Sequence, residues 1–207
     1  MLSHIDRFKH LPLLGTDAHE VVLPEMARQR AMAMQRDQNP RISSVAITMF
    51  PEAGETHLLL IKRQSYKGVH SGQIAFPGGK QEVQDGSLES TARREMKEEI
   101  GIPTGLPNLV RALSEVYIPP SRFLVHPFVF YINALPNLVK QEREVSQVLK
   151  VPLSLILDDD SIQFGGIKMS NGMRIKSPYF NFDGHQIWGA TAMMLSELRH
   201  MIKQLKV

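Results

Sequence analysis

Three glutamates near the middle of the chain could bind a metal ion. Glu95, Glu98 and Glu99 follow one another closely in the sequence REMKEEIG. On a helix, which turns by about 100° per residue, Glu95 and Glu99 project on the same side as Leu88 and Ala92, and Glu98 lies at the edge of that side. Two like charges about 4 Å apart repel by roughly 1 kcal/mol in water and by about 4 kcal/mol in a partly buried site. The pattern therefore favours a hard divalent cation, Mg²⁺ or Mn²⁺, as their partner.

The residues around these glutamates support a built site. Arg94 stands within the cluster and can orient a carboxylate through paired hydrogen bonds. Upstream, Gly78 and Gly79 allow backbone conformations that are closed to other residues, and can bring a carbonyl oxygen or an amide close to a metal or a phosphate. The alternative is a solvated helix with ordinary pairs such as Glu89 and Arg93. That alternative does not account for the glycine turn in front of the helix.

Strands on either side of one helix must position this site. The helix runs through the glutamates. Before and after it, strands are predicted at 42–50, 57–63, 73–76, 109–118 and 123–132. The first two are separated by the turn-rich sequence PEAGET and form a candidate hairpin. The rest of the chain is predicted to hold a polar stretch at 140–148, a short helix at 152–157, paired strands around 165–177 and a core helix at about 190–205.

Composition excludes several classes of protein. The chain has 207 residues, enough for one sizeable core, and it has no cysteine, which excludes disulfides, thiolate catalysis and cysteine-bound zinc. The 24 Lys and Arg are scattered among 21 Asp and Glu, so the net charge of +3 does not indicate nucleic acid. No apolar run reaches the about 20 residues of a membrane span, and the N-terminus does not read as a signal peptide. We expect a cytoplasmic protein with an N-terminal extension at 1–40, including a helix at 24–35, and a domain at 41–207.

The sequence from Gly79 to Ile102 resembles the Nudix box. That pattern is a glycine, five residues, a glutamate, seven residues, then Arg-Glu-hydrophobic-x-Glu-Glu-x-Gly-hydrophobic. REMKEEIGI, which begins at Arg94, matches the second half at each specified position. In the first half the loop carries one extra residue, and Asp85 stands where glutamate is usual. The resemblance implies an α/β fold, a Nudix-type α/β/α sandwich with a mixed sheet, that hydrolyses a pyrophosphate bond of a nucleoside diphosphate derivative.

The same resemblance assigns roles to individual residues. The metal ions would be held by Glu95, Glu98, Glu99 and the carbonyl oxygen of Gly79. They would neutralise the bridging phosphates and acidify a bound water that attacks phosphorus. Glu98 and Arg94 are the catalytic residues that it implies within the box. In many relatives the general base lies on a loop outside the box, and our candidate is Glu144, with Glu142 as the second choice.

The segment LLIKRQSYKGVHSGQIAFPGG, from residue 59 to residue 79, is similar to an additional motif of the coenzyme A pyrophosphatase branch. Arg63 matches this motif, whereas Gln64 stands where Ser or Ala is usual and Gly68 where Arg is usual. The implied reaction cleaves coenzyme A or a derivative into 3′,5′-ADP and 4′-phosphopantetheine or its acyl form. Arg63 and the neighbouring Lys67 would bind the 3′-phosphate, and Gly78 would also contact the substrate.

Two alternatives stay open at this point. The first is another Nudix substrate, such as ADP-ribose, NADH or an oxidised nucleoside triphosphate. The second is a ligand-sensing module without activity, although a protein that only binds has no need to keep like charges together. The expected partner is a small nucleoside diphosphate compound, neither a nucleic acid nor a membrane. The oligomeric state is open, with a homodimer among the options.

Overall fold

The computed structural model describes residues 2–22, 37–65, 70–168, 172 and 174–205 of the chain. The helix predicted at 24–35 and Lys67 lie outside the described residues. Helices α1 (Leu2–His10) and α2 (Thr16–Glu20) precede the sheet and were not predicted. Phe8 and Val22 are buried in the same apolar cluster as the C-terminal helix, so these N-terminal residues pack onto the domain. The domain boundary at residue 40 stays a prediction.

The central sheet is mixed, as expected from the sequence. Strands β1 (Arg41–Glu52) and β2 (Glu55–Arg63) form the predicted antiparallel hairpin. Strand β7 (Phe123–Tyr131) pairs with β1 in parallel. The other strands of this sheet are β3 (Ile74–Ala75), β4 (Gly78–Lys80), β5 (Asn108–Ala112), β6 (Val116–Ile118) and β8 (Val145–Pro152). The order along the sheet is β3-β2-β1-β7-β5, with β8 paired to β2 and β4 to β1.

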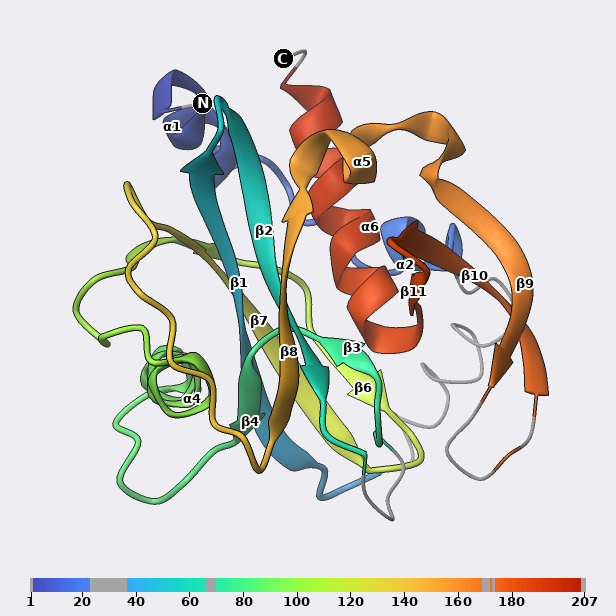
Figure 1. Ribbon diagram of the computed structural model, residues 1–207, viewed down its shortest axis with the longest axis horizontal. Helices are drawn as coiled ribbons and strands as arrows, with labels where there is room; N and C mark the ends of the chain where they lie inside the picture. Colours follow the sequence, from blue (N-terminus) through green and yellow to red (C-terminus); the bar gives the residue numbers. More distant parts are fainter. Residues whose placement is uncertain (1, 23–36, 66–69, 169–171, 173, 206–207) are drawn as a thin grey trace.

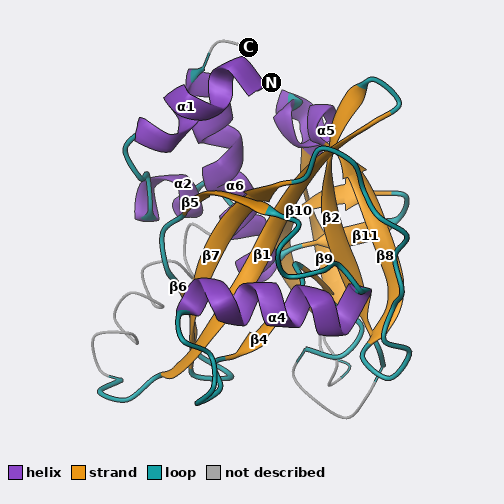
Figure 2. Cartoon of the chain, turned by 90° about the vertical axis from the view of Figure 1, so that its left-hand side faces the viewer, coloured by secondary structure: helices purple, strands orange, loops and turns teal. Residues whose placement is uncertain are grey.

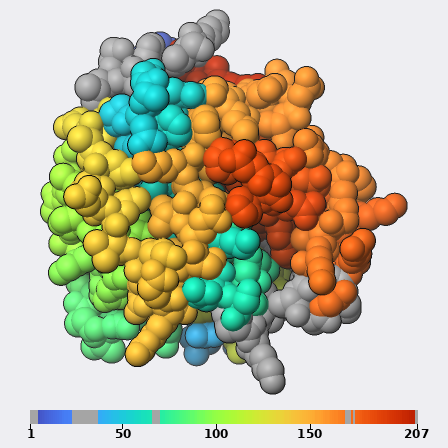
Figure 3. All heavy atoms as spheres, in the orientation of Figure 1, coloured from blue at the N-terminus to red at the C-terminus, as the bar shows by residue number. Residues whose placement is uncertain are grey.

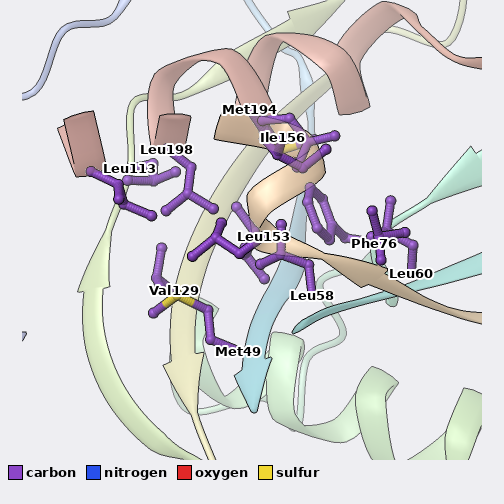
Figure 4. Close-up of a cluster of buried hydrophobic side chains, with 14 of the residues drawn as sticks. Met49, Leu58, Leu60, Phe76, Leu113, Val129, Leu153, Ile156, Met194 and Leu198 are labelled. Carbon is purple, nitrogen blue, oxygen red and sulfur yellow. The ribbon is translucent and has the colours of Figure 1, made fainter. Parts of the chain in front are cut away.

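Helices cover both faces of this sheet. Helix α4 (Leu88–Ile100) lies across one face and α6 (Gly189–Gln204) across the other (Figures 1 and 2). Successive side chains of a strand point to opposite faces. In β2, Leu58 and Leu60 therefore join the cluster beneath α6, whereas Leu59 and Ile61 join the cluster beneath α4. Two buried faces explain why the strand sequence is continuously apolar. Figure 4 shows the cluster beneath α6, where residues of β1, β2, α5 and α6 meet.

The C-terminal part adds a second, smaller sheet beside α6. Helix α5 (Leu153–Leu157) and a 3₁₀ turn (Asp159–Ser161) lead into β9 (Ile162–Lys168), β10 (Arg174–Phe182) and β11 (His185–Ile187). The predicted pair of strands is confirmed as β9 and β10, and β11 is an addition. In the part of the chain that the structure covers, no helix has the length and apolar character needed to cross a membrane.

Two sequence predictions of strands needed correction. The single strand expected at 109–118 is broken into β5 and β6, because the Ser114 N–H and hydroxyl bond the Glu197 carboxylate at 3.0 and 2.6 Å and so leave the sheet ladder. The polar stretch at 140–148 contains the start of β8. Strand β8 lies at the edge of the sheet beside β2 and has polar residues at its exposed positions. These polar residues make the alternation of buried and exposed positions hard to recognise in the sequence.

Candidate active site

Helix α4 carries the three glutamates at graded depths. It begins at Ser87, whose hydroxyl accepts a hydrogen bond from the Ser90 N–H, and ends at Gly101 in the left-handed conformation. Glu99 is 1% exposed, the Glu95 side chain is 13% exposed and the Glu98 side chain is 57% exposed. The helical geometry predicted from the sequence is therefore right for Glu95 and Glu99, and Glu98 reaches solvent from the edge.

The two glycines of β4 stand in contact with this helix. The Gly78 N–H donates a 2.9 Å hydrogen bond to Glu99 Oε2. A Cβ atom at Gly79 would lie closer to the Glu95 carboxylate than real Cβ atoms come, and one at Gly78 would clash with the Ser44 carbonyl. Neither glycine has a positive φ. The expectation of an unusual backbone conformation is therefore corrected: close approach to the backbone of β1 requires glycine at position 78, whereas a side chain at position 79 would displace the Glu95 carboxylate.

Arg94 links two of the glutamates to a fourth carboxylate. Its NH1 donates to Glu95 Oε1 and to Glu98 Oε2, both at 2.9 Å. Its Nε and NH2 donate to the two oxygens of Asp85, again at 2.9 Å. Asp85 also accepts from the Thr91 hydroxyl at 2.9 Å. No role was predicted for Asp85, although it stands where the box pattern has a glutamate, and that position was the signal. In the structure Asp85 positions Arg94.

The electrostatics of the cluster reflect buried like charges. The pKa of Glu99 is raised to about 8, chiefly by burial. The Glu95 and Glu144 carboxylates contribute to this rise, and Arg63 and the Gly78 N–H oppose it. Burial also raises the pKa of Glu95, which Arg94 opposes. Because the Glu144 carboxylate contributes to both shifts, it lies within electrostatic range of the cluster.

Arg63 faces the deepest glutamate. Its NH1 lies 3.4 Å from Glu99 Oε1, and its side chain is 26% exposed. The pairing of β2 with β8 shifts register between Lys62 and Arg63, an irregularity of the kind that re-aims a side chain near active sites. Among the described residues, no hydrogen-bond partner of the buried Arg63 Nε is present. Arg63 is therefore held beside the cluster by its contact with Glu99.

The candidate general base lies on the turn that leads into β8. The Gln141 N–H donates to the Glu99 carbonyl at 2.8 Å, and the Glu144 carbonyl accepts from the Gln64 N–H at 2.8 Å. The Glu144 side chain is exposed. Glu142, the second choice, forms an ion pair with Lys140 at 3.1 Å. The structure thus brings the turn of Glu144 to the carboxylate cluster.

The donors of this site fit a hard divalent cation. Carboxylate oxygens are the ligands that Mg²⁺ and Mn²⁺ prefer, and burial disfavours the charge of Glu95 and Glu99 in the protein alone. In the structure Arg94 holds Glu95 and Glu98, and within the described residues no three His, Asp or Glu side chains are grouped closely enough to share one ion. Coordination of an ion therefore requires Glu95 or Glu98 to turn away from Arg94.

Comparisons with solved structures show the fold. The nudix hydrolase RenU of M. smegmatis is 16% identical, with a TM-score of 0.54, over 80% of this chain and 87% of its own. A MutT protein from Methanosarcina mazei Go1 is 22% identical, with a TM-score of 0.53, over 83% of this chain and 99% of its own. These likenesses place the mixed sheet and its flanking helices in the Nudix fold.

Comparisons of sequence identify the family. The model described as "NUDIX domain" matches residues 40–163. An uncharacterized Nudix hydrolase named NudL from Photorhabdus laumondii is 30% identical over 146 residues, 70% of this chain and 77% of its own length. Its namesake from Yersinia pestis is 31% identical over 153 residues, 74% of either chain. With more than half of the chain matched by the family model, this protein belongs to the Nudix family and is a pyrophosphohydrolase.

Proposed function

We propose that this Nudix hydrolase cleaves the pyrophosphate bond of coenzyme A or a derivative, giving 3′,5′-ADP and 4′-phosphopantetheine or its acyl form. The observation that supports this substrate is the placement of residues 59–79, the segment similar to the coenzyme A pyrophosphatase motif. It runs from β2 through β3 into β4. Both Arg63 and Gly78, near its two ends, contact Glu99. The motif that suggests the substrate thus adjoins the carboxylates that would act on it.

The proposed metal ligands are the carboxylates of α4 and one backbone oxygen. Nudix hydrolases generally use divalent metal ions, and the residues that would hold one here are Glu95, Glu98, Glu99 and the Gly79 carbonyl. Such an ion, Mg²⁺ or Mn²⁺, supplies charge neutralisation at the diphosphate and a lowered pKa for a bound water.

The remaining residues have proposed roles in binding and proton transfer. Arg94, held by Asp85, orients Glu95 and Glu98. Glu144 accepts the proton of the attacking water. Arg63 and Lys67 contact the phosphates of the substrate. A cytoplasmic location stays a prediction from the sequence, and the oligomeric state stays open, with a homodimer among the options.

A product screen tests the substrate. The purified protein is incubated with coenzyme A, 3′-dephospho-coenzyme A, ADP-ribose, NADH and 8-oxo-dGTP, each with Mg²⁺ and with Mn²⁺, and products are identified by mass spectrometry. We expect the highest kcat/KM for coenzyme A or an acyl derivative, with 3′,5′-ADP as product. A higher kcat/KM for ADP-ribose or NADH would move the assignment to another Nudix pyrophosphatase. Binding without hydrolysis of any compound would indicate a ligand-sensing module.

A further inference from the structure

The turn that carries Glu144 is organised around a single residue, Gln141. Its carbonyl accepts hydrogen bonds from the Glu144 N–H at 3.0 Å and the Val145 N–H at 2.8 Å. Its side-chain oxygen accepts from the Arg143 N–H at 2.8 Å. These bonds fix the shape of the turn. They do not fix its place relative to the carboxylate cluster.

Two neighbouring elements hold the turn in place. On one side, the Gln141 N–H bonds the Glu99 carbonyl at the end of α4. On the other side, Gln64 follows the last residue of β2 and forms two bonds of 2.8 Å, from its N–H to the Glu144 carbonyl and from its side-chain amide to the Glu142 carbonyl. The space-filling view shows residues 140–150, in yellow and orange, at the surface beside the teal segment that follows β2 (Figure 3).

The side-chain bond of Gln64 depends on both its length and its chemistry. The Glu142 carbonyl is at the surface, and the glutamine amide reaches it as a donor at the end of a long side chain. Alanine offers no donor, and the hydroxyl of serine stops far short of the carbonyl. Without this bond, the Glu142 end of the turn loses its tie to Gln64, and the connection to β2 is left to the Gln64 backbone, the pairing of Arg63 with Val145 and the bond from the Ser146 hydroxyl to the Lys62 carbonyl.

We propose that Gln64 is a positioning residue for the reaction, because its side chain fixes the turn that carries Glu144 against the carboxylate cluster of α4. The inference rests on the role of Glu144 in the proposed function. Glu144 is exposed and held only through its backbone in the bonds described above. The position of its carboxylate therefore depends on the position of the turn. Loss of about an ångström of placement is enough to slow a reaction strongly.

A double-mutant cycle tests the proposal. Gln64→Ala, Glu144→Gln and the double variant are assayed with Mg²⁺ on coenzyme A and, in parallel, on ADP-ribose. The matched control is Gln147→Ala, an exposed glutamine on the adjacent strand β8. We expect Gln64→Ala to lower kcat about tenfold with KM nearly unchanged. In the Glu144→Gln background, Gln64→Ala should change kcat by less than about twofold. Gln64→Lys, which restores a donor, should recover most of the rate.

Several results would overturn the proposal. A full Gln64→Ala effect in the Glu144→Gln background would mean that Gln64 acts independently of Glu144. If Gln64→Ala has wild-type kcat while Glu144→Gln is slow, the positioning role of Gln64 is wrong and Glu144 stays the proposed general base. If Glu144→Gln has wild-type kcat, both the role of Glu144 as general base and the positioning role of Gln64 are wrong. Hydrolysis of ADP-ribose instead of coenzyme A would contradict the proposed substrate, and the double-mutant cycle measured on ADP-ribose would still test the role of Gln64.

Hydrogen exchange gives a readout that does not depend on activity. Amides of peptides covering residues 139–148 should exchange faster in Gln64→Ala than in wild type or Gln147→Ala, while thermal unfolding stays unchanged. Equal exchange in all three proteins would also overturn the proposal.

Discussion

Glu99 is the residue where the site departs most from ordinary protein electrostatics. The Glu99 carboxyl group is 1% exposed, and burial raises its pKa to about 8. The group therefore binds its proton more tightly in the folded protein than in the unfolded chain. Its contribution to folding is therefore fully present below its ordinary pKa of about 4.5 and is lost as pH rises to about 8. At neutral pH the metal-free protein therefore keeps this group largely protonated, at a cost to its folding stability.

We predict that Glu99→Gln lowers turnover by orders of magnitude and stabilises the metal-free protein. Glutamine keeps the volume and can still accept the Gly78 hydrogen bond, but it cannot hold a cation. The loss of stability between about pH 4.5 and about pH 8 should be smaller in the variant than in wild type. Steady-state kinetics and thermal unfolding in chelator measure both effects, and Glu98→Gln should show the kinetic effect alone. Full wild-type activity in excess chelator would contradict the metal assignment.

Arg63 offers a second prediction at this scale. Because its NH1 lies 3.4 Å from Glu99, the contact it can make is with the diphosphate end of a substrate bound to the cluster. We expect Arg63→Ala to lower kcat/KM for coenzyme A and for 3′-dephospho-coenzyme A by similar factors, about tenfold to a hundredfold for a lost charged hydrogen bond. A loss confined to coenzyme A would instead place Arg63 at the 3′-phosphate, as the sequence suggested.

At the scale of the elements, the site depends on the close approach of β4 to α4, where Gly78 and Gly79 lie against Glu99 and Glu95. We predict that Gly79→Ala weakens metal binding, because the added methyl group must displace the Glu95 carboxylate. Gly86→Ala is the matched control, since a Cβ there meets no atom within 4 Å. The control should keep its activity and gain about 0.4–1 kcal/mol of unfolding free energy from reduced freedom of the unfolded chain. Mn²⁺ titration by electron paramagnetic resonance and urea unfolding measure these effects. Equal Mn²⁺ affinity in the two variants would contradict the steric argument.

Local sequence was sufficient for some elements and insufficient for others. Helix α4 was predictable because its apolar positions, its box pattern and its end at Gly101 agree. The break between β5 and β6 could not be predicted from local sequence, because Glu197, which causes it, stands 83 residues away from Ser114 in the chain. The role of Gln64 was hidden for the same reason: its partner carbonyl belongs to a distant turn. The sequence therefore predicted the helix, the side of it that carries Glu95 and Glu99, and the contact of Arg94 with a carboxylate, but not Asp85, which holds Arg94.

At the scale of the whole molecule, one buried carboxylate joins three separate parts of the chain. Glu197 of α6 is 0% exposed. Its Oε1 accepts from the Leu14 and Gly15 N–H groups at 3.1 Å, and it also binds Ser114. His19 Nε2 lies 3.5 Å from Oε2. The N-terminal segment, the β5–β6 corner and the last helix thus share a single acceptor.

We predict that Glu197→Gln lowers the free energy of unfolding by about 3 kcal/mol. The NH₂ group of glutamine would face N–H groups that now donate to the carboxylate, and these buried N–H groups would lose their acceptor. Burial alone would raise the pKa of Glu197, but His19, Ser114 and the backbone N–H groups lower it to about 2. A lowered pKa stabilises the fold above about pH 4.5, and this stabilisation is lost as pH falls toward 2. Urea unfolding of wild type and variant should therefore converge at low pH. The kcat should stay near the wild-type value, because Glu197 belongs to α6, which covers the sheet face opposite α4 (Figure 1). A stability difference that persists at pH 2 would show that Glu197 acts through shape and not through charge.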